Sequence, residues 1–270
     1  MSIEALKLEF KERIERYYEE LGDQLGWSSL IKKQVIKEKI VGKDGKDRVE
    51  ELERYTQLRH KRILDVGSGF GGFIVFANKA GATTLGIEPD QSRIELCKIY
   101  LKLNGMRKML CVGTGEKLPF RDDVFDIVTC HQVLEHTQNP AAIIKEMVRV
   151  LKSRGLLYIT TPNYLFPYEG HYRIMWIPLC PKKLGKLILR IRRKESSYLY
   201  SLNYTTLYSI LRVLKEANIK NVRNLTTEKI KNSDVILPKK RRFIAKVFQW
   251  LHIPHLASLL APQVEILAEK

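Results

Sequence analysis

The 270-residue sequence lacks several features that mark particular classes of protein. No apolar run approaches the ~20 residues that a membrane-spanning helix needs. The opening stretch MSIEALKLEFKERIERYYEE is charged and has no apolar core of the signal-peptide kind, so we expect a folded, soluble, cytoplasmic protein. No repeat or low-complexity tract is present either.

Cysteine is scarce, and acidic residues are few in one region. Cys97, Cys111, Cys130 and Cys180 form no CxxC pair, which favours buried thiols in a reducing compartment over a zinc site. Residues 172–250 carry 19 Lys and Arg against 4 Asp and Glu, and therefore hold +15 of the formal net charge of +17. A surplus confined to one segment indicates a local anionic partner there.

From residue 62 onward, short apolar runs alternate with amphipathic stretches. Strands are predicted at 62–66, 83–88, 108–113, 125–130 and 155–161. Helices are predicted between them at 72–79, 91–103 and 139–152. This alternation is typical of a parallel sheet with crossover helices, whose ligands bind beyond the carboxyl ends of the strands.

The flanking segments complete the prediction of the fold. Helical spacing covers 2–21 and 28–58, where GKDGKD at 42–47 is expected to form a loop. After the proline- and aromatic-rich segment, the chain is expected to form a helix, a strand, a basic helix and a last strand at 204–217, 221–229, 239–252 and 263–269. We predict an α/β fold: a doubly wound, Rossmann-like seven-stranded sheet with N-terminal helices and a basic helical cap inserted after the fifth strand. The expected divisions are an N-terminal helical region, the core, the cap and a C-terminal completion, at 1–60, 61–162, 163–203 and 204–270.

The stretch ILDVGSGFGGF at 63–73 predicts a cofactor-binding loop. It satisfies GxGxxG and also DxGxGxG, with Asp65 before Gly67 and Gly69. Glycines permit positive φ and a close approach of the backbone, and a helix N-terminus offers free N–H groups. A carboxylate at position 65 would repel a pyrophosphate, whereas it favours the ammonium and sulfonium of S-adenosylmethionine. Asp65 therefore argues for the methyl donor over a nicotinamide dinucleotide.

Glu88 ends the second predicted strand, 21 residues after Gly67. This is the spacing at which an acid accepts hydrogen bonds from a ribose diol, and it fits either cofactor. The structural alternative is a strand-end acid that caps the next helix, with Pro89 at its start.

Four motifs in order resemble the class I S-adenosylmethionine-dependent methyltransferases, especially the branch that includes ubiquinone-biosynthesis methyltransferases. They are ILDVGSGFGGF, GIEPD, GEKLPFRDDVFDIVTCHQVLEH and LLYITTPN. The resemblance covers roughly residues 60–162, and LAPQVEILAEK is similar to that family's last strand. It implies S-adenosylmethionine as the cofactor, with Asp65 at its methionine end, Glu88 at the ribose and the segment before LPF at the adenine. The adenine segment is Thr114, Gly115 and Glu116, where Thr114 departs from the Asp or Asn that the family often has.

Histidines near the strand ends are the candidate catalytic groups, because an acceptor hydroxyl needs a general base while positioning supplies much of the rate. His131 follows the fourth strand at a position similar to the family's cofactor-side residue, so we assign it to cofactor or substrate contact. In TPNYLFPYEGHYR, His171 is the preferred base and Glu169 its orienter. The alternative is a surface loop that only packs the cap.

His136 is the second candidate base, within HQVLEH, although the Glu135–His136 pair has a purely structural reading as a cap of that segment. Related ubiquinone O-methyltransferases show an acid, two residues and then Glu-His here, a pattern associated with a divalent metal. This sequence has Gln132 in place of the acid, and an amide is a poorer ligand for a hard cation than a carboxylate. No metal is predicted.

Two amphipathic basic helices are predicted at 182–194 and 239–252. In the first, Leu184, Leu187, Ile188 and Ile191 share one side, and Lys183, Lys186, Arg190 and Arg193 the other. They could lie on an anionic membrane, bind nucleic acid phosphates, or dock on the domain with solvated charges. Nearby Trp176, Ile177, Leu179, Phe243 and Trp250 favour lipid.

These observations favour an S-adenosylmethionine-dependent methyltransferase acting on oxygen of a small, glycan or lipid-linked acceptor, at the inner face of a membrane. The alternative is an RNA-binding or RNA-modifying methyltransferase-like protein, although no nucleic-acid module is recognisable. A nicotinamide oxidoreductase comes third, because Asp65 and LPFRDDVFDIV have no role in it.

Overall fold

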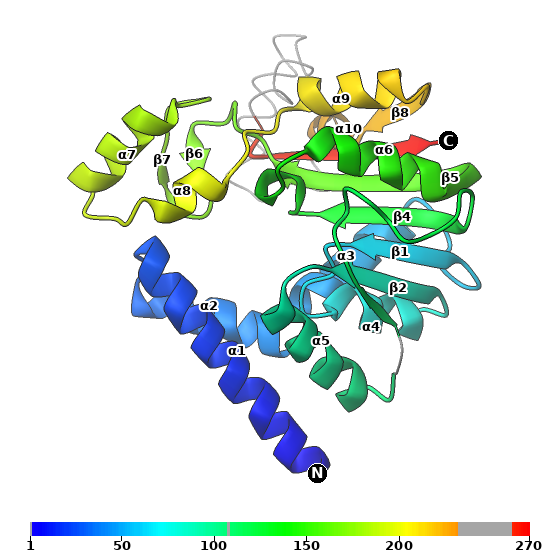
Figure 1. Ribbon diagram of the computed structural model, residues 1–270, viewed down its shortest axis with the longest axis horizontal. Helices are drawn as coiled ribbons and strands as arrows, with labels where there is room; N and C mark the ends of the chain where they lie inside the picture. The colour runs from blue at the N-terminus through cyan, green and yellow to red at the C-terminus, as the bar shows by residue number, and fades with distance from the viewer. Residues whose placement is uncertain (1, 107–108, 232–260) are drawn as a thin grey trace.

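The computed structural model describes residues 2–106, 109–231 and 261–270. A seven-stranded sheet with the order β3-β2-β1-β4-β5-β9-β8 forms its centre (Figure 1). The strands are β1 (Arg62–Val66), β2 (Thr83–Glu88), β3 (Leu110–Val112), β4 (Phe125–His131), β5 (Leu151–Pro162), β8 (Asn221–Asn224) and β9 (Gln263–Glu269). The predicted α/β fold with a seven-stranded Rossmann-like sheet is confirmed.

The first five strands run parallel, whereas β9 is antiparallel to both β5 and β8. The chain runs outward from β1 through β2 to β3 and then returns to β4 on the other side of β1. The strand order therefore reverses between β1 and β4. Ligands of such sheets bind at this switch point, beyond the carboxyl ends of the strands.

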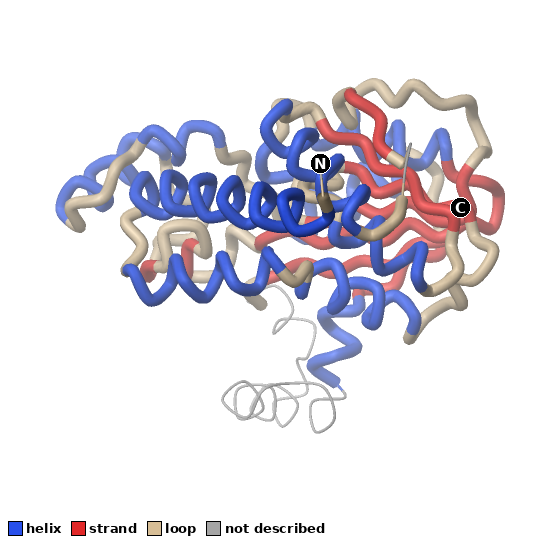
Figure 2. Tube along the Cα trace, turned by 90° about the horizontal axis from the view of Figure 1, so that it is seen from below, coloured by secondary structure: helices blue, strands red, loops and turns tan. Residues whose placement is uncertain are grey.

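Helices cover both faces of the sheet (Figure 2). Alternate residues of β1 point to opposite faces, so Leu64 and Val66 pack under α6 (Pro140–Val150) and α9 (Leu207–Glu216). Ile63 packs with α3 (Lys43–Glu53), α4 (Gly72–Lys79) and α10 (Leu225–Lys231). The same alternation turns Asp65 toward the face that α3 covers.

The crossover helices begin where the sequence predicts them. Gly71, at φ 81°, leads into α4, and Asp90 caps α5 (Gln91–Leu103) by accepting a hydrogen bond from the backbone N–H of Arg93. The bounds of α4 and α5 match the predicted ranges. Because Asp90 is the cap of α5, the structural alternative in which Glu88 caps that helix is wrong.

Three helices precede the sheet: α1 (Ile3–Leu25), α2 (Ser29–Ile40) and α3. The loop expected over 42–47 is wrong in most of its length, since the break is at Val41 and Gly42 and the following residues form the first turn of α3. Gly45 is a packing residue: a Cβ there would lie 2.1 Å from the carbonyl carbon of Gly72 on α4. The glycine lets two helices approach closely.

Another prediction fails in the C-terminal part, where the strand expected over 221–229 ends at Asn224. The Asn224 side chain accepts a hydrogen bond from the Thr227 N–H, and α10 starts at Leu225. Leu225 is fully buried in the core, which holds the helix against the sheet. The second basic helix, predicted at 239–252, lies outside the described residues.

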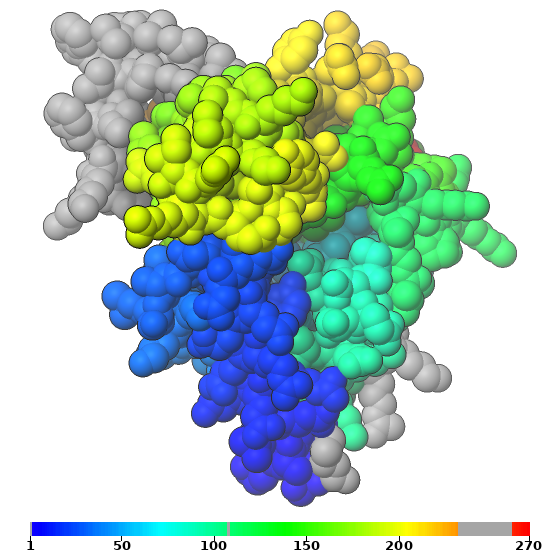
Figure 3. Space-filling view, turned by 60° about the vertical axis from the view of Figure 1, so that its left-hand side comes forward, coloured from blue at the N-terminus to red at the C-terminus, as the bar shows by residue number. Residues whose placement is uncertain are grey.

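The segment after β5 forms a cap of β6 (Tyr168–Glu169), β7 (Ile174–Met175), α7 (Lys182–Ile191) and α8 (Ser197–Ser201). Its apolar cluster of Tyr172, Trp176, Cys180, Leu189 and Leu199 includes Leu25 of α1. Figure 3 shows the cap directly against the N-terminal helices. The Trp27 indole N–H donates to the backbone oxygen of His171 over 2.7 Å.

Two further expectations concern the thiols and the membrane. All four cysteines are free; Cys97, Cys130 and Cys180 are buried and Cys111 is partly exposed. In the described part of the chain, every helix is too short or too polar to cross a bilayer.

Candidate functional site

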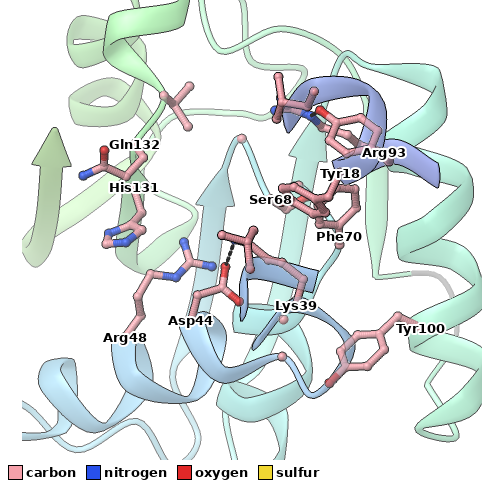
Figure 4. Close-up of a pocket in the computed structure, with 18 of the residues that line it drawn as sticks. Tyr18, Lys39, Asp44, Arg48, Ser68, Phe70, Arg93, Tyr100, His131 and Gln132 are labelled. Atoms are coloured by element: carbon pink, nitrogen blue, oxygen red, sulfur yellow. Dashed lines mark hydrogen bonds and ion pairs between the residues drawn. The ribbon is translucent and has the colours of Figure 1, made fainter. Parts of the chain in front are cut away.

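A cavity of about 340 Å³ lies at the switch point of the sheet (Figure 4). The glycine loop after β1, the end of β4 at His131, the N-terminal helices and His171 of the cap form its walls. Segments from four regions of the sequence therefore enclose one space beyond the carboxyl ends of β1 and β4.

The glycine loop presents bare backbone to this cavity. Gly67 and Gly69 have φ of 72° and 55°, in the left-handed region that the sequence motif predicted. A Cβ on Gly67 would lie 2.3 Å from a methyl group of Val133, whereas a Cβ on Gly69 would meet no atom within 4 Å. Gly67 is thus required for packing, and Gly69 leaves open space for a ligand.

The Asp65 carboxylate is completely buried beside this loop. One oxygen accepts a hydrogen bond from Thr129 over 2.8 Å, while Oδ2 has no hydrogen-bond donor and lies 3.7 Å from Nη2 of Arg48. Burial raises the pKa of Asp65 to about 6, against the opposing effects of Arg48 and Thr129. The sequence position, at the end of a strand, predicts that Asp65 faces the cleft. This is wrong, because alternation along β1 turns the side chain toward α3, and it does not line the cavity.

Arg48 is the functional candidate that the sequence reasoning missed. Its side chain is 10% exposed, borders the cavity beside His131 and Asp44 (Figure 4), and has no hydrogen-bond partner for Nε. A sequence signal was present, because Arg48 lies one helical turn before the fully buried Leu52. A charged residue on the buried edge of a helix indicates a specific partner.

Glu88 is 2% exposed and holds the glycine loop. Oε2 accepts a hydrogen bond from the Gly69 N–H over 2.9 Å, and Oε1 accepts one from the Asp90 N–H over 3.1 Å. A carboxylate has about four lone-pair sites, so both oxygens can accept a further hydroxyl. Thr114, Gly115 and Glu116 are expected at the adenine. They follow β3, and none of them borders the cavity.

His131 ends β4 on the cavity wall, and its contact with cofactor or substrate stays a prediction. Its Nδ1 hydrogen-bonds the Thr160 hydroxyl of β5. Burial, with the nearby charge of Arg48, lowers the pKa of His131 well below its usual value. The ring is therefore neutral at physiological pH and serves as a fixed polar wall.

His171 and Glu169 come together as the sequence reasoning expected. Nδ1 of His171 lies 2.7 Å from Oε1 of the buried Glu169, whose other oxygen accepts the Tyr172 N–H over 2.6 Å. Because a carboxylate only accepts, Nδ1 carries a proton and Nε2 is the basic nitrogen. Burial opposes the charged ring, but Glu169 outweighs it and raises the pKa of His171.

His136 stands beside this pair, with its ring centroid 5.1 Å from that of His171. Partial burial and the charges of His171 and Arg93 lower the pKa of His136 to about 3. Glu135 is fully buried, accepts a hydrogen bond from Thr161, and has its pKa raised to about 7 by burial. These opposite shifts make the imidazole of His171 a stronger base than that of His136.

Glu135, His136 and His171 each place one potential ligand atom within 4.8 Å of the others. The sequence argument considered only Gln132 and missed His171, which the cap brings from 35 residues away. The group offers one carboxylate beside two imidazoles, whereas hard cations such as Mg²⁺ and Ca²⁺ prefer oxygen ligands. That the site works without a metal stays a prediction.

The sheet order, the antiparallel β9 and the glycine loop after β1 define the Rossmann-like fold of the class I methyltransferases. Residues 64–159 match a family model described as a methyltransferase domain. This segment is therefore similar to methyltransferase domains, and the resemblance predicted from the sequence is confirmed for residues 64–159.

Two relatives and one solved structure illustrate the likeness. A ubiquinone biosynthesis O-methyltransferase from Bartonella bacilliformis is 30% identical over 143 residues, covering 47% of this chain and 58% of its own length. The protein of that name from Pelagibacter ubique is 27% identical over 216 residues, covering 75% and 86%. An S-adenosylmethionine dependent methyltransferase from Mesorhizobium loti superposes with a TM-score of 0.52 at 16% identity, covering 81% and 94%, a likeness of fold alone. This chain spans only 50% to 58% of the length of several of the curated relatives.

Proposed function

We propose that the protein transfers the methyl group of S-adenosylmethionine to a hydroxyl oxygen of a small acceptor. The observation that carries this proposal is the single cavity of about 340 Å³ that joins the glycine loop and Arg48 to His171. A sulfonium held at one end and a hydroxyl held at the other would meet within it. Such positioning supplies much of the acceleration of a bimolecular displacement.

In this proposal the charged groups of the cofactor pair with opposite charges of the site. The ammonium is attracted by the negative charge of Asp65, whose buried carboxylate lies behind the cavity wall, and the cofactor carboxylate lies toward Arg48. The ribose hydroxyls bind Glu88, and the adenine lies along residues 114–116. None of these residues borders the described cavity, so in this proposal the cofactor extends past its walls toward the ends of β2 and β3. The buried Asp65 oxygen without a donor and the open space at Gly69 support this fit.

His171 acts as the general base in the reaction, and Glu169 holds it in the required tautomer. The acceptor hydroxyl gives its proton to Nε2 of His171 as its oxygen bonds to the methyl carbon. The carbon–sulfur bond breaks in the same displacement, and its electrons stay on sulfur as S-adenosylhomocysteine leaves. The lowered pKa of His136 makes that ring a weaker base, so it serves as a wall of the acceptor site. The O-methyltransferase names of the relatives agree with an oxygen acceptor.

We also propose that residues 163–203 act as a cap that docks on an anionic membrane and delivers a lipid-linked acceptor. On α7, Leu184, Leu187 and Ile191 of the predicted apolar stripe are 41%, 51% and 72% exposed, whereas its fourth member, Ile188, packs against the cap core. Ile177 and Leu179 are also exposed, whereas Trp176 is buried in the cap core and cannot contact lipid. Exposed apolar side chains with basic neighbours are typical of helices that lie in a membrane interface.

Calorimetric titration tests the cofactor assignment. The protein should bind S-adenosylmethionine and S-adenosylhomocysteine but not NADH, and Arg48→Met should weaken both because it leaves the cofactor carboxylate unpaired. Binding of NADH, or of none of the three, would refute the proposal.

Co-sedimentation with vesicles that contain an anionic lipid tests the cap. Changing Lys186, Arg190, Arg192 and Arg193 to Glu should abolish it, while the same number of changes on α1, at Lys7, Lys11, Arg13 and Arg16, should not. Equal sedimentation of both variants would leave the cap as a purely structural element.

A further inference from the structure

Three cationic side chains border the described cavity, and two of them have carboxylate partners. Nζ of Lys39 lies 2.7 Å from Asp44, and Nη2 of Arg48 lies 3.7 Å from Asp65. Arg93, in the first turn of α5, forms no ion pair with any residue in the ranges that the structure describes. An unpaired guanidinium in a largely enclosed site calls for an anionic ligand.

The Arg93 side chain is held in place by one edge only. Its Nε donates a hydrogen bond to the Tyr17 hydroxyl of α1 over 3.2 Å. Tyr17 in turn packs edge-on against Phe70 of the glycine loop, with ring centroids 5.3 Å apart. The two terminal nitrogens of Arg93 make no hydrogen bond to a described residue. The guanidinium can therefore still bind a carboxylate in a bidentate manner.

Arg93 also lies close enough to the proposed base to share a substrate with it. Arg93, His136 and His171 all border the same cavity, and the ring centroids of His136 and His171 lie 5.1 Å apart. In Figure 4, Arg93 stands near Tyr18 and Phe70, on the other side of the cavity from Arg48 and His131. The guanidinium is thus separate from the pair proposed for the methionine end.

The remaining walls favour a flat ring. Six aromatic side chains line the cavity: Phe10, Tyr17, Tyr18, Trp27, Phe70 and Tyr100. Asp44 is the one Asp or Glu side chain on its described walls, and it is already paired with Lys39. Aromatic walls with a surplus of positive charge suit an aromatic anion.

We propose that Arg93 is a specificity-determining residue that binds the carboxylate of a hydroxylated aromatic acid, while the hydroxyl of that acid reaches His171. This inference rests on the proposed function and names its acceptor class. Tyr17 acts as a positioning residue, because its hydroxyl orients the guanidinium and contributes no charge of its own.

Two probes of the same shape test the charge requirement, 4-hydroxybenzoate and 4-hydroxybenzamide. Each is titrated by calorimetry into the protein saturated with S-adenosylhomocysteine. The wild type should bind the acid about tenfold or more tightly than the amide, which is the range for a hydrogen bond to a charged group. Arg93→Gln should abolish the preference, Arg93→Lys should keep part of it, and Tyr17→Phe should reduce it.

Arg13→Gln is the matched control, because Arg13 is 42% exposed and pairs with Glu9 and Glu95 on the outer surface. It should leave the preference unchanged. The prior titration with S-adenosylhomocysteine shows whether each variant is folded, and a wild type that fails to bind it refutes the proposed function itself. If S-adenosylhomocysteine binds normally, then equal affinity for the two probes, binding of neither, or a preference that survives in Arg93→Gln overturns the assignment of Arg93.

Discussion

The contact between Glu169 and His171 allows a sharp test of the proposed base. The Glu169 side chain is 1% exposed, and its two oxygens serve two donors, Nδ1 of His171 and the Tyr172 N–H. Glu169→Gln keeps the shape but offers one acceptor oxygen where two are needed. The remaining –NH₂ group must then face either the ring or the backbone N–H, and both are donors in the wild type.

The substitution changes both the strength and the tautomer of the base. Hydrogen bonds to charged groups contribute about 1.5–3 kcal/mol, so loss of the carboxylate removes a stabilisation of this size from the protonated ring and lowers the pKa of His171. If the amide –NH₂ turns to the ring, Nδ1 becomes the acceptor and the proton moves to Nε2, where the base is needed. The turnover should then fall by about 10²-fold or more.

The sign of the pH dependence follows from the role of the ring. A general base works only when it is unprotonated, so the rate rises with pH through the pKa of His171, which Glu169 holds above the usual value. Loss of the carboxylate lowers this pKa and should shift the acid limb of the profile to lower pH. At high pH, the rate of Glu169→Gln should level off at a lower value than that of the wild type.

The assay is the initial rate of S-adenosylhomocysteine formation at saturating cofactor, with a hydroxylated acceptor, between about pH 5 and 9, a range that spans the usual pKa of histidine. His136→Ala is the control and should leave the acid limb in place. An unchanged limb in Glu169→Gln, or one shifted to higher pH, would refute the assignment of His171.

Three further outcomes are expected. Asp65→Ala should abolish calorimetric binding of S-adenosylmethionine while the far-ultraviolet circular dichroism stays normal; near-normal affinity would contradict the proposed orientation of the cofactor. Gly67→Ala should lower the free energy of unfolding by about 1–3 kcal/mol, since a left-handed Ala and a clash with Val133 are both costly, and Gly69→Ala should lower it less. Chelation with EDTA should leave methyl transfer unchanged, whereas loss that Zn²⁺ or Mn²⁺ restores would reassign Glu135, His136 and His171 as metal ligands.

The sheet was predictable because its signals are local. Short apolar runs, ended by glycine or an acid, predicted β1 and β2, and Gly71 and Asp90 mark the starts of α4 and α5. The two strongest errors also have local causes. The sequence predicts a turn at Gly45, but this residue lets two helices pack closely. The sequence also predicts a strand to residue 229, but Asn224 ends it by capping the next helix.

The site was predictable only where its partners are close in sequence. Glu169 and His171 are two residues apart, so a loop that reverses direction brings them together without help from the rest of the fold. Arg48 meets Asp65, and Arg93 meets Tyr17, through the packing of separate helices. No periodicity within either segment specifies such a meeting, which depends on how α1 and α3 dock on the core.

The hydrogen bond from the Trp27 indole to the His171 backbone joins the N-terminal helices to the residue proposed as the base. Lys194 reinforces this seam by donating to the carbonyl oxygens of Leu25 and Gly26 over 2.9 and 2.7 Å. Any parting of the cap from the N-terminal helices breaks these bonds and withdraws the imidazole from the cavity. The position of the His171 imidazole in the cavity therefore depends on the docking of the cap against α1 and α2, so a substitution of Trp27 should disturb His171 although the two residues are 144 positions apart.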